Sequence, residues 1–266
     1  MIAVALGRPG AYLPYPYGAG EAAPARPQHR KMQMIETVPL FTRRAGLALG
    51  LSSLVGLAGC NDSNQNAKAP EKPANPAIEP TVNVAELMKP GDLRDEMLGK
   101  ADAPVTIIEY ASMTCGHCAN FHNEGFPHLK EKYIDTGKVK YIFREFPLDP
   151  LAYAASLLAR CAGEGKFYPM LELLFKQQRN WALTDKPEEA LLATVRQAGF
   201  TQESFNACLQ DQASYASLQK GRQRASEVFK VDSTPSFFIN GRIERGAMSP
   251  QQIDKVLAPH LAAAGK

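Results

Sequence analysis

A pair of cysteines is the part of this sequence best suited to do chemistry. Cys115 and Cys118 are separated by a glycine and by His117. The thiolate is the nucleophile in disulfide exchange, and positions i and i+3 of a helix lie on one face, close enough for two cysteines to form a disulfide. His117 can add a positive or hydrogen-bonding group beside them. The motif therefore predicts a redox-active Cys115–Cys118 disulfide.

The residues on either side of the motif predict a strand followed by a helix. Residues 105–110 are rich in β-branched and aromatic types, which indicates a buried strand, and residues 119–124 tolerate a helix. Cys115 would then lie at the first turn, where unpaired N–H groups stabilise negative charge. We expect the pKa of Cys115 to fall from about 8.5 into the range of roughly 3.5–7.5.

A Cys-X-X-Cys pair has two other interpretations. Half of a zinc site would need two further ligands at similar spacing. Cys161 and Cys208 are single and far apart, and His122 and His128 do not form a partner pair. Two inert thiols are the third possibility. The sequence favours redox chemistry over both and predicts no metal site.

Three segments together resemble a known family. Residues 103–110, the Cys115–Cys118 motif and the later run 233–241 (Ser-Thr-Pro-Ser-Phe-Phe-Ile-Asn-Gly) resemble the DsbA-like thiol oxidoreductases, over roughly residues 95–260. The resemblance implies an α/β thioredoxin fold with an inserted helical domain, thiol:disulfide exchange and no bound cofactor. The Gly-His dipeptide departs from the Pro-His that DsbA-like proteins more often carry and resembles protein disulfide isomerase.

The resemblance also assigns roles to residues outside the dithiol. It makes Pro235 a cis-proline that faces the dithiol, although an ordinary trans proline is commoner at a strand start. The backbone of Thr234 would then pair with an extended substrate chain. Glu109 corresponds to a buried acid that helps move the proton of Cys118, the alternative being an exposed glutamate on an edge strand. We expect His122 to be a solvated residue rather than a catalyst.

The first 60 residues predict export to the bacterial cell envelope. Residues 1–31 are rich in Ala, Gly and Pro, and we interpret them as a non-native or disordered extension. Residues 32–60 have the pattern of a signal peptide, with Arg43–Arg44 before an apolar run too short to span a membrane. The run ends in Leu-Ala-Gly-Cys60, which looks like a lipoprotein cleavage site. Ordinary cleavage, which would release a soluble periplasmic protein, and twin-arginine export both stay open.

The remaining chain divides into four segments. Residues 61–81 are Pro-rich and predict a linker, and residues 82–150 form the first part of the thioredoxin domain. Residues 151–224 carry apolar residues at helical spacing and predict the helical insert. Residues 225–266 return to the sheet through an Asn-Gly hairpin and end in a helix.

The insert contains two further cysteines, Cys161 and Cys208. In an oxidising compartment we expect them to form a structural disulfide, whose loop closure would stabilise the fold by up to roughly 4 kcal/mol. Some members of the resembled family carry a second disulfide in this domain. Two buried free thiols are the alternative.

The charge balance excludes a nucleic-acid footprint. Residues 1–60 hold six of the 30 Lys and Arg but two of the 27 Asp and Glu, so the remainder carries 24 basic and 25 acidic residues. A net charge near −1 gives no basic surface of the kind that binds phosphates.

Three functions are consistent with the sequence. The leading one is a monomeric periplasmic oxidase, tethered through Cys60, that introduces disulfides into reduced exported proteins and is reoxidised by a quinone-linked membrane partner. The second is a disulfide isomerase or reductase. The polar linker is too Pro-rich to form the dimerisation domain of such isomerases, whereas a Thr before the cis-proline mildly favours this function. The third is a non-catalytic chaperone, for which Cys115→Ala would leave function intact.

Overall fold

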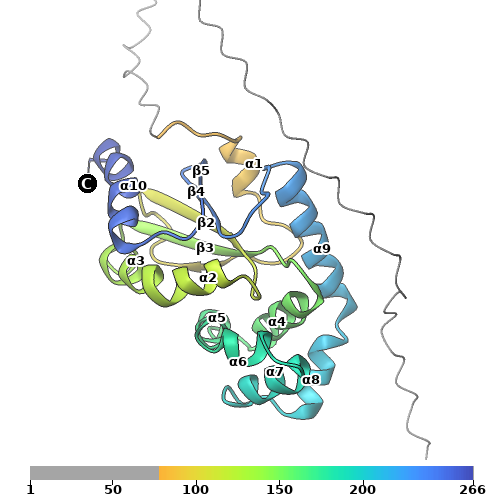
Figure 1. The fold of residues 1–266 in the computed structure, drawn as a ribbon. Coiled ribbons are helices and arrows are strands. Elements are labelled where there is room, and N and C mark those ends of the chain that lie inside the picture. The colour runs from red at the N-terminus through yellow and green to blue at the C-terminus, as the bar shows by residue number, and fades with distance from the viewer. Residues whose placement is uncertain (1–77, 266) are drawn as a thin grey trace, which may run out of the picture. The chain divides into compact units, whose positions relative to one another are not determined.

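A five-stranded sheet forms the centre of the molecule, whose computed structural model describes residues 78–265 (Figure 1). The strand order is β1-β3-β2-β4-β5, with β2 and β3 parallel and the other neighbours antiparallel. The strands are β1 (Glu96–Leu98), β2 (Val105–Ala111), β3 (Val139–Glu145), β4 (Ser236–Ile239) and β5 (Arg242–Arg245). The predicted signal peptide, Cys60 and nearly all of the predicted linker lie outside the described residues.

Apolar side chains cover both faces of the sheet. Along β2, Ile107 points into a core formed with the dithiol helix, the helical insert and the C-terminal helix, whereas its neighbour Ile108 points into a second core. This second core is covered by α1 (Val84–Met88) and by the end of α9 (Gln212–Glu227). Because successive side chains of a strand alternate between these two covered faces, the residues of β2 are buried apart from the half-buried Thr106, and Glu109 is the charged residue among them.

The chain leaves β2 through the dithiol and continues as one helical stretch. It consists of α2 (Gly116–Asn120), a π-helical turn η1 (Phe121–Gly125), α3 (Phe126–Leu129) and a second π-helical turn η2 (Lys130–Ile134). The predicted helix therefore exists, but two wide turns interrupt its regular spacing. Such π-bulges rotate the side chains that follow them and are frequent at functional sites.

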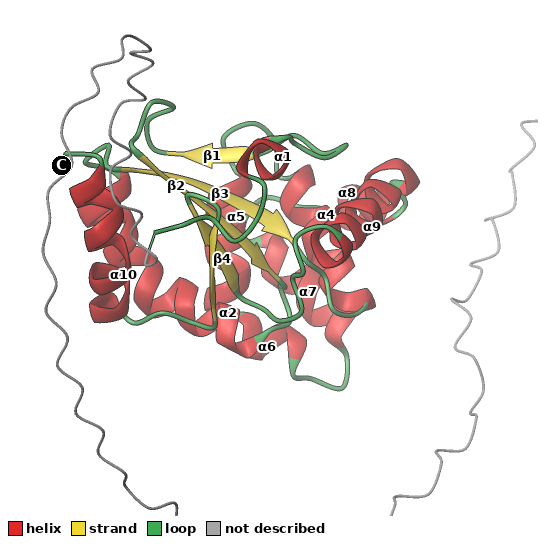
Figure 2. Cartoon of the chain, turned by 90° about the horizontal axis from the view of Figure 1, so that it is seen from above, coloured by secondary structure: helices red, strands yellow, loops and turns green. Residues whose placement is uncertain are grey.

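Between β3 and β4 the chain is helical, as predicted for the insert. Figure 1 shows α4 to α8 gathered together, with α9 running from this group back to the sheet, and Figure 2 shows α10 and α9 on opposite sides of the strands. Cys161 and Cys208 form a disulfide that joins the end of α4 to α8, with their Cα atoms 6.1 Å apart. The helices are α4 (Pro150–Cys161), α5 (Phe167–Lys176), α6 (Gln178–Ala182), α7 (Pro187–Arg196) and α8 (Gln202–Leu209).

The predicted Asn-Gly hairpin and the predicted C-terminal helix are both present. Asn240 and Gly241 connect β4 to β5 with φ angles of 48° and 86°, the left-handed conformation that a tight Asn-Gly turn requires. The helix α10 (Pro250–Ala263) starts at Ser249, whose side chain and that of Gln252 cap each other's backbone N–H groups.

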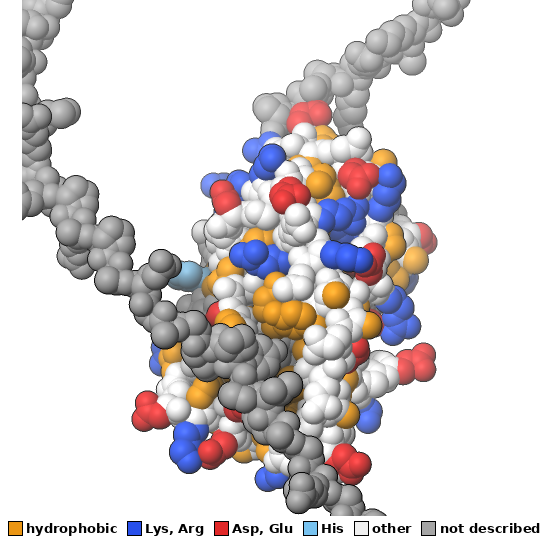
Figure 3. Space-filling view, turned by 90° about the vertical axis from the view of Figure 1, so that its right-hand side faces the viewer, with side chains coloured by type: hydrophobic (Ala, Val, Ile, Leu, Met, Phe, Trp, Pro, Cys, Tyr) orange, Lys and Arg blue, Asp and Glu red, His pale blue; other side chains and the backbone are white. Residues whose placement is uncertain are grey.

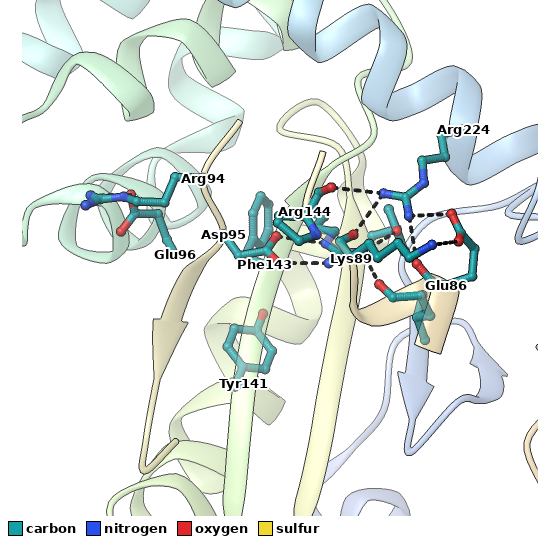
Figure 4. Close-up of polar contacts among 12 residues, drawn as sticks. Glu86, Lys89, Arg94, Asp95, Glu96, Tyr141, Phe143, Arg144 and Arg224 are labelled. Atoms are coloured by element: carbon teal, nitrogen blue, oxygen red, sulfur yellow. Dashed lines mark hydrogen bonds and ion pairs between the residues drawn. The ribbon is translucent and has the colours of Figure 1, made fainter. Parts of the chain in front are cut away.

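A buried guanidinium ties the N-terminal segment to the sheet (Figure 4). Arg144, on β3, donates to both carboxylate oxygens of Asp95 at 2.9 and 2.8 Å. Its remaining nitrogen donates to the Leu87 carbonyl at 2.8 Å and to the Tyr110 hydroxyl at 3.0 Å. These four bonds satisfy a charge that would otherwise be costly to bury, and they fix residues 87–95 across the end of the sheet.

The exposed surface carries charges of both signs. On the face shown in Figure 3, Lys and Arg side chains alternate with Asp and Glu, and no single-sign patch dominates. No helix within residues 78–265 is long and apolar enough to cross a bilayer. In the same region no cluster of three or more His, Cys, Asp or Glu side chains is arranged to hold a metal ion.

We predict that Asp95→Ala lowers the free energy of unfolding by roughly 2–3 kcal/mol, because it leaves the Arg144 guanidinium buried without its counter-charge. The effect falls below that of a fully buried pair because the Asp95 side chain is 20% exposed. Lys220→Ala, which breaks an exposed pair with Asp92, is the control and should cost under about 1 kcal/mol. Urea denaturation of the three proteins measures both values, and equal losses would contradict this account.

Candidate active site

The two motif cysteines occupy different environments at the start of α2. Cys115 is the N-cap residue of the helix and is partly exposed, whereas Cys118 lies within the helix and is 0% exposed. Both are free thiols in this structure. An attacking thiolate from solvent can therefore reach Cys115 and not Cys118.

Local hydrogen bonds make Cys115 acidic. The thiol of Cys118 and the backbone N–H groups of His117 and Cys118 stabilise the Cys115 thiolate, as does the Thr234 side chain, and together they lower its pKa to about 5 against the opposing effect of burial. In the thiol form, Cys115 Sγ donates to the Thr234 carbonyl oxygen at 3.3 Å. That bond favours the protonated state, but the stabilisation of the thiolate is larger.

The loop before β4 forms the opposite wall of the site. The Thr234–Pro235 peptide bond is cis, and Thr234 is the residue whose carbonyl contacts Cys115. Since β4 pairs with β2, this loop is held beside the end of the strand that leads into the dithiol. The structure thus brings Thr234 and Pro235 to the dithiol across more than a hundred residues of sequence.

The surroundings of Cys118 have the opposite effect. Burial raises the pKa of the Cys118 thiol well above its ordinary value, and its hydrogen bond to Cys115 and the negative charge of Glu109 raise it further. At neutral pH the reduced site therefore pairs a thiolate at Cys115 with a thiol at Cys118. Only the exposed sulfur is ready to act as a nucleophile.

Glu109 lies on the central strand beneath the dithiol and is 0% exposed. This excludes the alternative of an exposed glutamate on an edge strand. Its Oε2 accepts a hydrogen bond from the Tyr141 hydroxyl and lies 3.1 Å from His122 Nε2, and its Oε1 has no hydrogen-bond partner. The free oxygen is a site that can accept a proton.

The prediction that His122 is solvated is wrong. Its side chain is 3% exposed, and the imidazole stacks on Phe175 of α5 with ring centres 4.1 Å apart. The first π-helical turn begins at Phe121 and carries His122 beneath the helix, toward Glu109. His122 lies four residues after the buried Cys118, so regular helical spacing already places both side chains on one face.

His117 contributes through its backbone rather than its imidazole. The residue is exposed, and the group that it offers to the Cys115 thiolate is the backbone N–H. The expected contribution of its imidazole is therefore not observed in this structure. What matters at this position is a helical backbone that directs N–H groups at the sulfur.

Gln178 is a residue of the site that sequence reasoning missed. It begins α6 in the helical insert, and its side-chain amide donates to the carbonyl of Met113 at 2.8 Å and to that of Cys115 at 2.9 Å. These bonds fix the backbone that enters the dithiol. In the sequence Gln178 stands within the polar run of residues 176–180, and nothing there distinguishes it from its neighbours.

We predict that the ultraviolet absorption of the reduced protein shows one thiolate transition with a midpoint near pH 5. Cys115→Ala should abolish it. Cys118→Ala should move it to higher pH, because the Cys118 thiol is the largest stabilising contact of the Cys115 thiolate. A transition in the wild type near the ordinary value of 9.0 would show that these contacts do not act on Cys115.

Comparisons with known proteins identify the family of this chain. The sequence profile of the thioredoxin family matches residues 92–258, which is more than half of the chain. A protein of Rickettsia bellii, provisionally named a protein-disulfide oxidoreductase, is 37% identical over 164 residues, covering 61% of this chain and 63% of that protein. The chain thus spans slightly less than two thirds of this relative. A Rickettsia typhi protein of the same provisional name is 30% identical over 221 residues, covering 80% and 82% of the two chains.

A solved structure extends the similarity to the fold. The crystal structure of alpha-DsbA1 from Wolbachia pipientis superposes with a TM-score of 0.63 and 31% identity, over 68% of this chain and 98% of that protein. The expected thioredoxin fold with its helical insert is thereby confirmed. From its sequence and its fold, the chain belongs to the DsbA-like family of thioredoxin-fold proteins.

Proposed function

We propose that this chain is a periplasmic thiol:disulfide oxidoreductase that introduces disulfide bonds into exported proteins through Cys115 and Cys118. The observation that carries the proposal is the contrast between the two sulfurs. One is exposed and acidic, and the other is buried with a raised pKa beside a carboxylate. A zinc site or a pair of inert thiols would not need this contrast.

The first step is attack on the oxidised site. A substrate thiolate attacks Cys115 Sγ, the Cys115–Cys118 bond breaks, and its electron pair leaves on Cys118. Cys115 is the exposed sulfur, so the mixed disulfide forms there. The leaving thiolate of Cys118 is in a site that favours its protonation, which drives the bond to break.

The second step releases the substrate in its oxidised form. The second thiolate of the substrate attacks its own sulfur in the mixed disulfide, and Cys115 leaves as a thiolate that is already stabilised. Glu109 takes part in the proton transfers at Cys118, since its unpartnered Oε1 lies in the same buried region. No bound cofactor enters these steps.

The acidity of Cys115 favours the oxidising direction. The thiolate is stabilised only in the reduced protein, so the oxidised form gives up its disulfide more readily. Because the folded pKa is lowered to about 5, this stabilisation is present at neutral pH and is lost as the pH falls through about 5. A reductase would need the reduced state to be less favoured.

Substrates are reduced, extended segments of exported proteins. The cis peptide at Pro235 presents the backbone of Thr234 beside Cys115, where an extended chain can pair with it. We further propose that the protein acts as a monomer, that lipidation at Cys60 tethers it to the membrane, and that a quinone-linked membrane protein reoxidises it. These three expectations come from the sequence and the family resemblance.

Equilibration of the protein with glutathione tests the direction of exchange. Alkylation followed by mass analysis separates the Cys115–Cys118 pair from Cys161–Cys208, so no cysteine needs to be replaced. We expect a potential for the first pair between roughly −180 and −120 mV. A value near −270 mV, typical of a reductase, would contradict the proposal, and full function in Cys115→Ala would instead indicate a chaperone.

We also predict that Cys60→Ser moves the protein from the membrane fraction to the soluble periplasmic fraction when it is expressed in a bacterium. Lipidation supplies the anchor, and a serine cannot form the thioether that carries it. Detergent, but not high salt, should release the wild type. Recovery of the wild type as a soluble protein would show that cleavage near residue 60 is ordinary.

A further inference from the structure

His122 lies between the buried carboxylate of Glu109 and a pocket at the surface. The pocket has a volume of about 390 Å³ and lies among β1, the second π-helical turn and α5. Neither motif cysteine lines it. Its lining includes His122, Phe126 and Tyr168, together with exposed residues such as Lys130 and Glu172.

We propose that His122 transfers protons between Glu109 and water in this pocket, and so connects the buried Cys118 to solvent by a route separate from the substrate surface. His122 does not touch the reacting sulfurs, so it acts through Glu109. The inference deepens the proposed function and rests on it, because Cys118 must lose a proton only if the dithiol takes part in thiol–disulfide exchange.

Aromatic rings hold the imidazole in place for this role. Phe175 stacks on it with an interplanar angle of 14°, and Phe121, Phe126 and Phe143 surround it with ring centres 5.1 to 5.7 Å away. These contacts come from η1, α3, β3 and α5. They leave the ring little freedom to turn, so Nε2 stays 3.1 Å from Glu109 Oε2.

The second ring nitrogen is open to the pocket. Among the described residues, the hydrogen-bond partner of the imidazole is Glu109, which contacts Nε2. Within residues 78–265, the fully buried side-chain nitrogen and oxygen atoms without a partner are Glu109 Oε1 and His260 Nε2. His122 Nδ1 also lacks a partner among these residues but is not one of the fully buried atoms, so part of its surface is accessible. Since His122 lines the pocket, Nδ1 is the atom that water there can reach.

The proton path is balanced in both directions. When Cys118 attacks a mixed disulfide at Cys115, its proton passes to Glu109 Oε1. The protonated carboxyl group then gives a proton to Nε2 of the His122 tautomer whose hydrogen is on Nδ1. Nδ1 then releases a proton to water. The electrons of the S–H bond form the Cys115–Cys118 bond, and the substrate sulfur leaves as a thiolate. The reverse path returns a proton to Cys118 when the disulfide opens.

The groups around this path come from several elements. Glu109 is faced by Tyr141 of β3, whose hydroxyl donates to Oε2, and by Cys118 of α2. The pocket wall adds four titratable side chains, which are Glu96 of β1, Lys130 of η2, and Tyr168 and Glu172 of α5. Tyr168 holds its proton, because burial raises its pKa, and its hydroxyl donates to the Glu96 carbonyl. The imidazole is therefore the group that links the carboxylate to the pocket.

Resolution of a glutathione mixed disulfide tests the proposal. Reduced protein is mixed with oxidised glutathione and samples are quenched with acid. Mass spectrometry then quantifies the reduced protein, the mixed disulfide and the oxidised protein. The rate of the first step, formation of the mixed disulfide at Cys115, depends on the concentration of oxidised glutathione. The rate of the second step, attack by Cys118 on the mixed disulfide, does not. His122→Gln keeps an amide donor for Glu109 but cannot carry a proton. We expect it to slow the second step by about tenfold and to leave the first step unchanged.

His128→Gln is the matched control. His128 lies on the neighbouring helix, bonds Asp254 at 2.7 Å and does not line the pocket, so its variant should resolve at the wild-type rate. His122→Ala opens the path to small molecules, and we expect imidazole to restore its rate in proportion to imidazole concentration. A second step in His122→Gln within twofold of the wild type, or no rescue of His122→Ala, would overturn the proposal.

Two further checks keep the outcomes separate. Thermal unfolding shows whether the variants fold, and if neither does, nitrogen NMR of the wild-type His122 ring decides. The proposal requires the ring to exchange protons with water and to respond to the redox state, and a ring with one fixed tautomer in both states would overturn it. If the wild type forms no mixed disulfide, the proposed function fails. If the variants resolve the mixed disulfide at the wild-type rate, the proposed role of His122 is refuted and the proposed function of the dithiol stands.

Discussion

The burial of one carboxylate in the centre of the sheet is the constraint on which the rest of this site depends. Glu109 occupies the middle strand between β3 and β4, with no exposed surface, directly beneath the dithiol helix. An unpaired charge there would be costly, so the fold surrounds it with the Tyr141 hydroxyl and the His122 imidazole. Its charge in turn helps to hold the proton on Cys118. The different reactivity of the two sulfurs thus depends partly on a residue that substrate never touches.

Helix geometry supplies the other half of that difference. Cys115 is the last residue before the helix and receives backbone N–H groups from its first turn, whereas Cys118 lies one turn further and loses contact with solvent. The two cysteine thiols therefore differ in acidity because they lie three residues apart at the start of the helix. The cis-proline loop adds a partner for Cys115 and leaves the approach to its sulfur open.

Local patterns predicted the elements of this fold well, because each has a short-range signature. The β-branched run of β2, the Asn-Gly turn and the Ser-Pro helix start all depend on neighbouring residues. The dithiol and the cis-proline were found because their motifs are specific in combination. His122 was misplaced because its buried partners, Glu109 and Phe175, are distant in the sequence. Gln178 and Arg144 were missed because their roles depend on partners far away in the sequence.

The hydrogen bonds of Gln178 make the helical insert part of the reactive geometry rather than a cover over it. One amide nitrogen bridges the carbonyls on both sides of the bend that leads into the dithiol. Any movement of α6 relative to β2 must either break both bonds or displace the backbone of Cys115. The position of α6 is therefore coupled mechanically to the helix start that sets the acidity of the attacking sulfur.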